Sequence, residues 1–414
     1  MTWNNKSLYM AILLLLLIGC KLQQHYEATS YAFPDPVDTE TKPIILQEKK
    51  IYNDPSFDVY ARNDFPGARL NDFTKLNDST YQVLVRPENE PINPSPWYAF
   101  KIWSKTRRQI NIRLLYEMAG HRYPPQISQN GKNWSYLDSL KVTKLDSTDI
   151  LMNLSVGPDT LWVAAQEIIN SLQVKEWAEG LSQHTDVKFH SFGSSKLGRP
   201  LFSLDIGGHQ PRKKKTIVLL SRQHPPEVTG FMALQAFLDK ILENSAQNKL
   251  FRSRYRVLVF PLMNPDGVDL GHWRHNAGGI DLNRDWQYYH QPETRQVADY
   301  VVNETEKNKS QVILGLDFHS TYYDIYYTNT LDSVSLLPHF TDQWLRKIEK
   351  AIPGYEINER PSGVGKPVSK GWFHTQFNAV GVTYEIGDQT PRDFILLKGA
   401  VSAEKMMEVL LEAD

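Results

Sequence analysis

Residues 216–227 read TIVLLSRQHPPE, an apolar run that is followed by a histidine and, three positions later, by a glutamate. Two more apolar runs occur at residues 256–260 and 312–316. Continuous apolar runs are typical of strands that are buried on both faces of a sheet. Residues 158–414 are therefore predicted to form an α/β domain, a mixed sheet flanked by helices. Apolar residues at helical spacing place its helices at residues 164–182, 230–244, 293–308 and 337–351.

In the residues before this domain, apolar side chains alternate with polar ones instead of forming continuous runs. Short alternating apolar runs occur at residues 81–85, 97–102 and 110–114, and turn-forming stretches such as 90–94 separate them. Alternation with frequent turns indicates antiparallel β structure. Residues 51–157 are therefore predicted to form an all-β sandwich domain, in which the sequence shows no catalytic cluster.

The first twenty residues have the layout of a secretory signal, with an apolar run at 11–18 and then Cys20. Residues 17–20 read LIGC and resemble the bacterial lipobox, in which the cysteine is acylated, and Cys20 is the only cysteine of the chain. The resemblance implies that 1–19 is a lipoprotein signal peptide and that 20–50 tethers the body to a membrane. We expect an exported, lipid-anchored protein on the periplasmic or cell-surface side. A plain signal peptide that contains a cysteine is the alternative.

The overall charge gives no indication of a nucleic-acid partner. The chain has 46 basic and 47 acidic residues and a formal net charge of -1. Binding to nucleic acid depends on a strong positive field. Selectivity is therefore expected to come from a local site.

Metal-binding residue types stand at the ends of the predicted strands. His224 and Glu227 follow the first apolar run, and His319 follows the third. The carboxyl ends of such strands meet at one edge of the sheet, so the three side chains are expected to converge. Two histidines and one carboxylate suit a catalytic zinc, which keeps a fourth position for water and lowers its pKa. Glu385, at the end of another short apolar run, is then a candidate general base for hydrolysis.

The pattern resembles the zinc carboxypeptidase family. Residues 264–267 read NPDG and residues 281–284 read DLNR, and they lie between His224 and His319 in the order of the family motifs. The resemblance covers about residues 187–387. It implies one zinc ion per chain, bound by His224, Glu227 and His319, with Glu385 as the general base.

Further roles are implied by the same resemblance. Asn283 and Arg284 bind the terminal carboxylate of the substrate, which suits the bidentate geometry of arginine. Arg274 polarises the scissile carbonyl, and Asp281 orients a zinc histidine. The preceding β domain and the short spacing from Arg274 to Asn283 are similar to the cytosolic carboxypeptidase branch, whose members remove acidic residues such as glutamate.

The chain departs from the digestive members of the family at three points. Pro226 stands where those members have an arginine, so one carbonyl contact is missing. No clear match exists for the tyrosine that caps bound substrate, and Tyr355 is a weak candidate. Lys370 lies near the position that sets side-chain preference, where a cation favours an acidic residue.

The predicted function is therefore zinc-dependent trimming of the C-terminus of peptides. A zinc amidase or carboxypeptidase acting on peptidoglycan peptides is the alternative, because export would place the protein beside the cell wall. A binding module that has lost catalysis is a third reading. The presence of all three ligands and of Glu385 argues against it.

Overall fold

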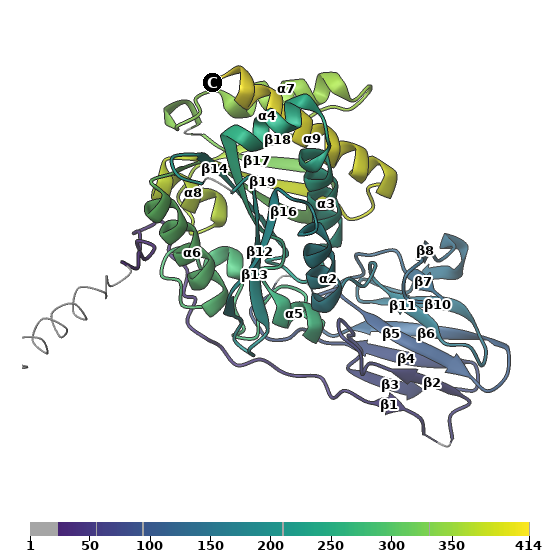
Figure 1. The fold of residues 1–414 in the computed structure, drawn as a ribbon. Coiled ribbons are helices and arrows are strands. Elements are labelled where there is room, and N and C mark those ends of the chain that lie inside the picture. Colours follow the sequence, from purple (N-terminus) through teal and green to yellow (C-terminus); the bar gives the residue numbers. More distant parts are fainter. Residues whose placement is uncertain (1–23, 55, 93–94, 209–210, 331, 414) are drawn as a thin grey trace, which may run out of the picture.

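The structure is a computed structural model and describes residues 24–54, 56–92, 95–208, 211–330 and 332–413. A β domain and a larger α/β domain lie side by side (Figure 1). The predicted signal peptide and Cys20 fall outside the described residues. Within the residues described, no helix is both long and apolar enough to cross a membrane.

The β domain consists of two sheets with a shared core. One sheet has the order β1-β2-β5-β11-β7-β8 and the other β3-β4-β6-β10-β9. Alternate residues of each sheet, such as Ile102 and Ile112, are buried in one cluster between them. The strands are β1 (Ile51–Tyr52), β2 (Val59–Arg62), β3 (Asp72–Lys75), β4 (Thr80–Val85), β5 (Ala99–Ser104), β6 (Arg108–Tyr116), β7 (Gln126–Ser128), β8 (Ser135–Tyr136), β9 (Val142–Lys144), β10 (Asp149–Val156) and β11 (Leu161–Ala164). The predicted sandwich is therefore present.

The sandwich continues beyond the predicted boundary at residue 157. Strand β11 pairs with β5 and β7, so it belongs to the β domain although a helix was predicted to begin at residue 164. Helix α2 (Ser171–Leu181) begins later, because Asn170 and Gln173 cap its first turn through reciprocal hydrogen bonds of 3.0 and 2.9 Å. The apolar residues of β11 suit a helix or a strand, and the cap decides where the helix starts.

The α/β domain is built on an eight-stranded mixed sheet with the order β12-β13-β15-β14-β16-β19-β17-β18. The four central strands β15, β14, β16 and β19 are parallel, so their carboxyl ends share one edge. Ile217 and Leu219 face one core and Val218 and Leu220 face the other, which explains the continuous apolar run. The strands are β12 (Val187–Ser194), β13 (Pro200–Ile206), β14 (Lys215–Ser221), β15 (Tyr255–Phe260), β16 (Gln311–Thr321), β17 (Ile325–Asn329), β18 (Glu359–Ser362) and β19 (Val380–Gly387).

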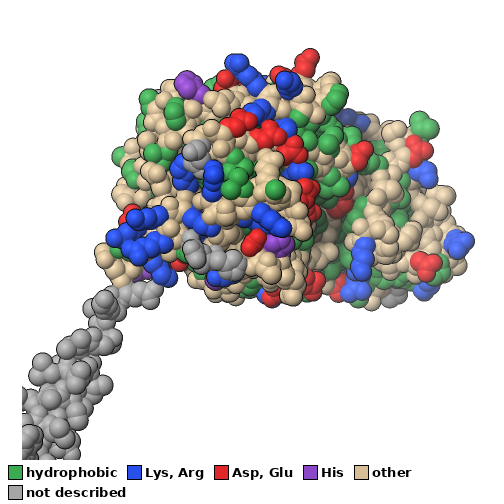
Figure 2. Space-filling view, turned by 45° about the horizontal axis from the view of Figure 1, so that its top comes forward, with side chains coloured by type: hydrophobic (Ala, Val, Ile, Leu, Met, Phe, Trp, Pro, Cys, Tyr) green, Lys and Arg blue, Asp and Glu red, His purple; other side chains and the backbone are tan. Residues whose placement is uncertain are grey.

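Helices cover both faces of this sheet, as predicted (Figure 1). Residues of α2, α3, α4, α7 and α9 pack in one core, and residues of α6 and α8 pack in the other. The helices after α2 are α3 (Val228–Leu242), α4 (Ala246–Arg254), α5 (Pro265–Leu270), α6 (Pro292–Asn308), α7 (Phe340–Ala351), α8 (Ser369–Phe377) and α9 (Arg392–Glu412). The face shown in Figure 2 carries both basic and acidic side chains, with many of the basic ones gathered toward the left of the larger domain.

The described part of the predicted tether, residues 24–50, lies against the α/β domain and leads to β1 (Figure 1). The backbone N–H of Ala28 donates to Asp299 over 3.0 Å, and the N–H of Lys42 donates to the carbonyl of Gly278 over 2.8 Å. Phe33 is buried. The segment has no helix or strand, and these hydrogen bonds to distant segments hold it in place. It is anchored to the body rather than a free tether.

Candidate active site

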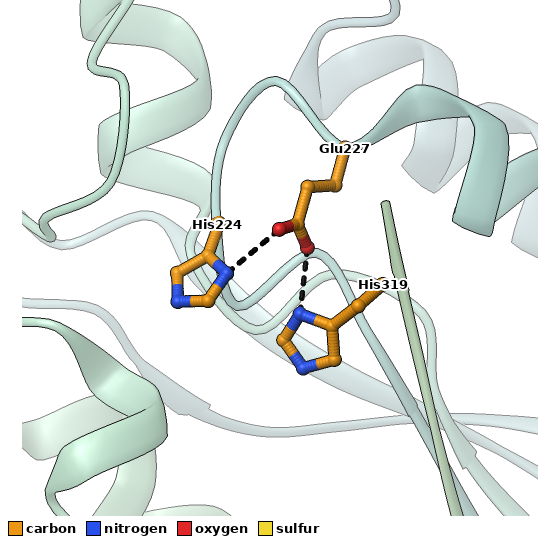
Figure 3. A group of neighbouring side chains, drawn as sticks. All are labelled: His224, Glu227 and His319. Atoms are coloured by element: carbon orange, nitrogen blue, oxygen red, sulfur yellow. Dashed lines mark hydrogen bonds and ion pairs between the residues drawn. The ribbon is translucent and has the colours of Figure 1, made fainter. Parts of the chain in front are cut away.

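Three side chains converge at the carboxyl edge of the sheet (Figure 3). His224 follows β14, Glu227 precedes α3, and His319 lies near the end of β16. The Nδ1 atoms of His224 and His319 lie 2.8 and 2.7 Å from the two oxygens of Glu227. One possible ligand atom from each residue lies within 4.8 Å of the others. Two imidazole nitrogens and a carboxylate oxygen at these separations fit the ligand set of a catalytic zinc.

The outer nitrogen of each imidazole is held by a second carboxylate. Nε2 of His224 is 2.9 Å from Asp281, and Nε2 of His319 is 2.8 Å from Asp317. Such partners fix the tautomer in which Nδ1 offers its lone pair to a metal. Burial opposes ionisation of Asp281, but Arg274 and His224 hold its pKa well below the usual range.

Asp317 was not predicted as a site residue. It lies two positions before His319 in β16, and alternate residues of a strand face the same side. The Nε2 amide of Gln223 donates to Asp317 over 2.5 Å, and Ser369 donates to the same carboxylate. The spacing of a carboxylate and a histidine on one strand was the signal that could have identified it.

Glu385 lies directly beside His319, because the two residues are paired in register between β19 and β16. Its Oε2 atom is buried without a hydrogen-bond partner among the described residues. Burial raises the pKa of Glu385 to about 7, although His319 opposes the shift. A carboxyl group that titrates near neutral pH can both accept and return a proton.

A cavity of about 900 Å³ opens onto these side chains. Its wall contains the three ligand residues, the predicted catalytic residues Glu385 and Arg274, and the predicted substrate-binding residues Asn283, Arg284 and Lys370. It also contains Arg122 of the β domain, which the sequence did not suggest. The cavity therefore combines a metal-binding group with several cationic side chains.

Arg274 is fixed against Asp281. Its Nε and Nη2 atoms both lie 2.8 Å from Oδ2 of that carboxylate, and its side chain is 19% exposed. Because Asp281 also holds His224, the guanidinium and the imidazole share one anchor. Arg274 is thus a rigid cation in the cavity wall.

Asn283 and Arg284 differ in how they face the cavity. The Oδ1 atom of Asn283 accepts from the backbone N–H of Ser369 over 2.9 Å. Its side chain is therefore engaged within the protein. Arg284 donates to the carbonyl of Asn283 over 2.7 Å, but 34% of its side chain stays exposed. Of this pair, Arg284 is the more available donor.

Lys370 is a buried cation in the cavity wall. Its ammonium donates to the side chain of Asn329 over 2.7 Å and to the carbonyls of Thr328 and Ser362 over 3.1 and 3.2 Å. No carboxylate among the described residues pairs with it. Burial lowers the pKa of Lys370 to about 8.

Tyr355 is not in the cavity wall. Its ring packs against Phe394 at a centroid distance of 5.5 Å. Tyr355 is therefore not positioned to cap a bound substrate, and that prediction is wrong. Tyr322 and Tyr327 line the cavity instead, and Tyr322 is 66% exposed.

The β domain clamps the loop that carries Arg274. The fully buried carboxylate of Glu88 accepts from the backbone N–H groups of Trp273, Arg274 and His275 over 3.1, 2.9 and 2.8 Å. Burial alone would raise the pKa of Glu88, but His272, Arg69 and these N–H donors lower it to about 2. The sequence predicted no site residue in the β domain, because nothing local in it indicates this contact.

Comparison with known proteins gives concordant results. A family model described as zinc carboxypeptidase matches residues 174–396. Cytosolic carboxypeptidase 3 of Bos taurus is 23% identical over 255 residues, which cover 54% of this chain but only 25% of that relative. The match thus spans about a quarter of the relative's length.

Two solved structures share the fold. The metallo-carboxypeptidase from Burkholderia cenocepacia has a TM-score of 0.72 at 17% identity and covers 86% of this chain and 100% of its own. The metallo-carboxypeptidase from Pseudomonas aeruginosa in complex with (2-guanidinoethylmercapto)succinic acid has a TM-score of 0.69 at 16% identity, with coverages of 86% and 100%. The likeness extends over more of the chain than the α/β domain alone, so it includes the β domain.

Proposed function

The chain belongs to the zinc carboxypeptidase family, and from this premise we propose that it is a zinc metallopeptidase that removes the C-terminal residue of peptides. The observation that carries the proposal is the cluster of His224, Glu227 and His319 beside the unpartnered carboxyl of Glu385. Arg284, in the same cavity, supplies a partner for a terminal carboxylate.

Enzymes of this family depend on zinc, and we assign one ion per chain to the three ligand residues. Zinc bound there would polarise a water molecule and the scissile carbonyl. Asp281 and Asp317 keep both imidazoles in the orientation that this requires.

The other side chains then have distinct roles. Glu385 accepts the proton of the attacking water and returns it to the amine that leaves. Arg274 donates to the carbonyl oxygen while negative charge develops on it. Its anchorage on Asp281 means that little reorganisation is needed during the reaction.

Arg284 and Asn283 are proposed to bind the terminal carboxylate. Changing Arg284 to Gln should lower kcat/KM for a peptide with a free C-terminus by about tenfold to a hundredfold, because a charge-assisted hydrogen bond is lost. The control is Arg295→Gln, at an exposed arginine outside the cavity wall. Steady-state kinetics of both variants test the proposal. An Arg284→Gln variant as active as the control would contradict carboxylate recognition by this residue.

We further propose a preference for acidic C-terminal residues, which rests on Lys370. Its position in the cavity wall supports this, and so does the absence of a carboxylate partner among the residues that the structure describes, because a buried cation favours a ligand that neutralises it. The proposal requires the ammonium to exchange one of its present contacts for the substrate carboxylate.

Lys370→Ala should therefore reduce the ratio of kcat/KM for Glu-ended over Leu-ended peptides by about tenfold or more, since a shielded ion pair contributes roughly 1–3 kcal/mol. Leu-ended peptides should be cleaved nearly as before. A thermal unfolding curve of the variant controls for loss of fold. An unchanged ratio would show that Lys370 only holds the segment around Ser362.

Peptidoglycan peptides remain the alternative substrate, because export would bring the protein close to them. The two substrate classes differ in the stereochemistry of the terminal residue. Hydrolysis of stem peptides that end in D-residues, without hydrolysis of matched L-peptides, would favour the alternative.

We also propose that the protein is a lipoprotein anchored through Cys20, on the basis of its lipobox-like sequence. Cys20→Ala should abolish acylation, since the chain has no other cysteine. Metabolic labelling with a fatty-acid probe in a bacterial host measures this. Continued labelling of the variant would contradict lipid attachment at this residue.

A further inference from the structure

Arg122 is a residue of the β domain that reaches the catalytic cavity. It lies in the connection between β6 and β7, and its neighbours Gly120 and His121 also line the cavity. None of the metal ligands or proposed carboxylate-binding residues comes from this domain. The inference drawn from Arg122 rests on the proposed carboxypeptidase function and concerns where the substrate chain lies.

The guanidinium of Arg122 is hydrogen-bonded through one nitrogen and packed against aromatic rings. Its Nε atom donates to Asp388 over 2.7 Å, and its central carbon lies 4.3 Å from the ring centroid of Tyr322 and 4.9 Å from that of Trp273. The side chain is 12% exposed. Among the described residues, Asp388 is the only hydrogen-bond partner of this group. Its two terminal nitrogens are left available to a ligand in the cavity.

Contacts between the two domains fix the position of Arg122 relative to the α/β domain. Glu88 binds the loop that carries Arg274, and Glu167 pairs with Arg392 over 2.7 Å. The amide of Gln166 donates to the backbone carbonyl of Asp388 over 3.1 Å, so the partner of Arg122 is also tied to the β domain. A donor that is fixed before the substrate arrives loses little entropy on binding.

The position of Arg122 indicates which part of a peptide it meets. Asp388 and Tyr322, which contact Arg122, directly follow β19 and β16. Asn283 and Lys370 are linked to each other instead through α8, where the N–H of Ser369 donates to Oδ1 of Asn283. If Arg284 binds the terminal carboxylate of the substrate, the substrate residues on the amino-terminal side of the scissile bond are the ones that can approach Arg122.

The chemistry favours a neutral acceptor. The charge of Arg122 is already offset by Asp388, which makes a second carboxylate a poor match and leaves directed N–H donors. A peptide carbonyl is the neutral acceptor that every substrate carries at this place. We infer that Arg122 donates to the backbone carbonyl immediately upstream of the residue whose own carbonyl is cleaved, so that the β domain supplies part of the substrate site.

Two substrates that carry no charge on the amino-terminal side of the scissile bond test this. One is an N-acetyl dipeptide, acetyl-Phe-Glu, which has the upstream carbonyl, and the other is 3-phenylpropanoyl-Glu, which lacks that amide. Arg122→Ala should lower kcat/KM for the first by about tenfold to a hundredfold and for the second by less than about twofold, because only the first loses a charge-assisted hydrogen bond. Arg122→Lys should restore part of the loss. The loss should appear mainly in KM.

Arg86→Ala is the matched control, because Arg86 forms an exposed ion pair with Glu117 in the same domain and lies outside the cavity wall. Calorimetric binding in the Glu385→Gln background gives a second readout, in which Arg122→Ala should weaken acetyl-Phe-Glu and not the shorter compound. Equal losses on both compounds, or none on either, would overturn the inference. A larger loss for substrates with an acidic residue before the scissile bond than for acetyl-Phe-Glu would also overturn it. Wild-type protein that hydrolyses neither compound would contradict the proposed function instead, and the binding readout would still decide the role of Arg122.

Discussion

Replacing Glu385 by glutamine is expected to lower kcat by about a hundredfold to ten-thousandfold, the range that general acid–base catalysis contributes. The amide has nearly the same shape as the carboxyl but cannot accept a proton from water. The Oε2 atom of Glu385 has no partner among the described residues, so the substitution breaks no hydrogen bond at that atom. Zinc content and thermal stability should therefore stay close to those of the wild type.

The measurement is the rate of C-terminal residue release by purified protein, together with elemental analysis for zinc. Glu356→Gln provides a matched control, because Glu356 is exposed and lies outside the cavity wall. Retention of more than about a tenth of wild-type turnover, well above the expected range, would place the general base elsewhere.

Loss of zinc is the expected result of His319→Ala. The substitution removes one of three ligands, so both bound zinc and peptide hydrolysis should fall below detection after dialysis. Asp317→Asn should have a graded effect, with zinc affinity reduced by about tenfold to a hundredfold, because the outer carboxylate orients the imidazole without touching the metal.

Competition with a chromogenic chelator measures both affinities without relying on activity. The zinc affinity should be lowest in His319→Ala, intermediate in Asp317→Asn and highest in the wild type. This order distinguishes a ligand from the carboxylate that supports it. Full zinc occupancy in His319→Ala would show that the metal, if bound, uses a different set of residues.

The metal cluster could be predicted from the sequence because each ligand lies close to an apolar run that is itself recognisable. Each candidate ligand stands near the end of an apolar run, and parallel strands bring those ends to one edge. Strands β14, β15 and β16 and helices α3, α6 and α7 were predicted from the same periodicity. The predicted α/β fold and family are confirmed by the solved structures that share the fold and by the family model.

Contacts between distant segments could not be predicted in this way. Glu88 and Arg122 have no neighbouring motif, and their roles arise only when the β domain packs against the loop at Arg274 and against Asp388. The anchored course of residues 24–50 depends on similar long-range hydrogen bonds. Periodicity describes which face of an element is buried but does not identify its partner.

Titration of metal-free protein with zinc is the most direct test of metal-dependent carboxypeptidase activity. The protein is incubated with a peptide and with its C-terminally amidated copy, and products are followed by mass spectrometry. The predicted result is release of single C-terminal residues from the free peptide only, rising with added zinc until about one equivalent is bound. Hydrolysis by the metal-free protein, or equal cleavage of the amidated copy, would contradict it.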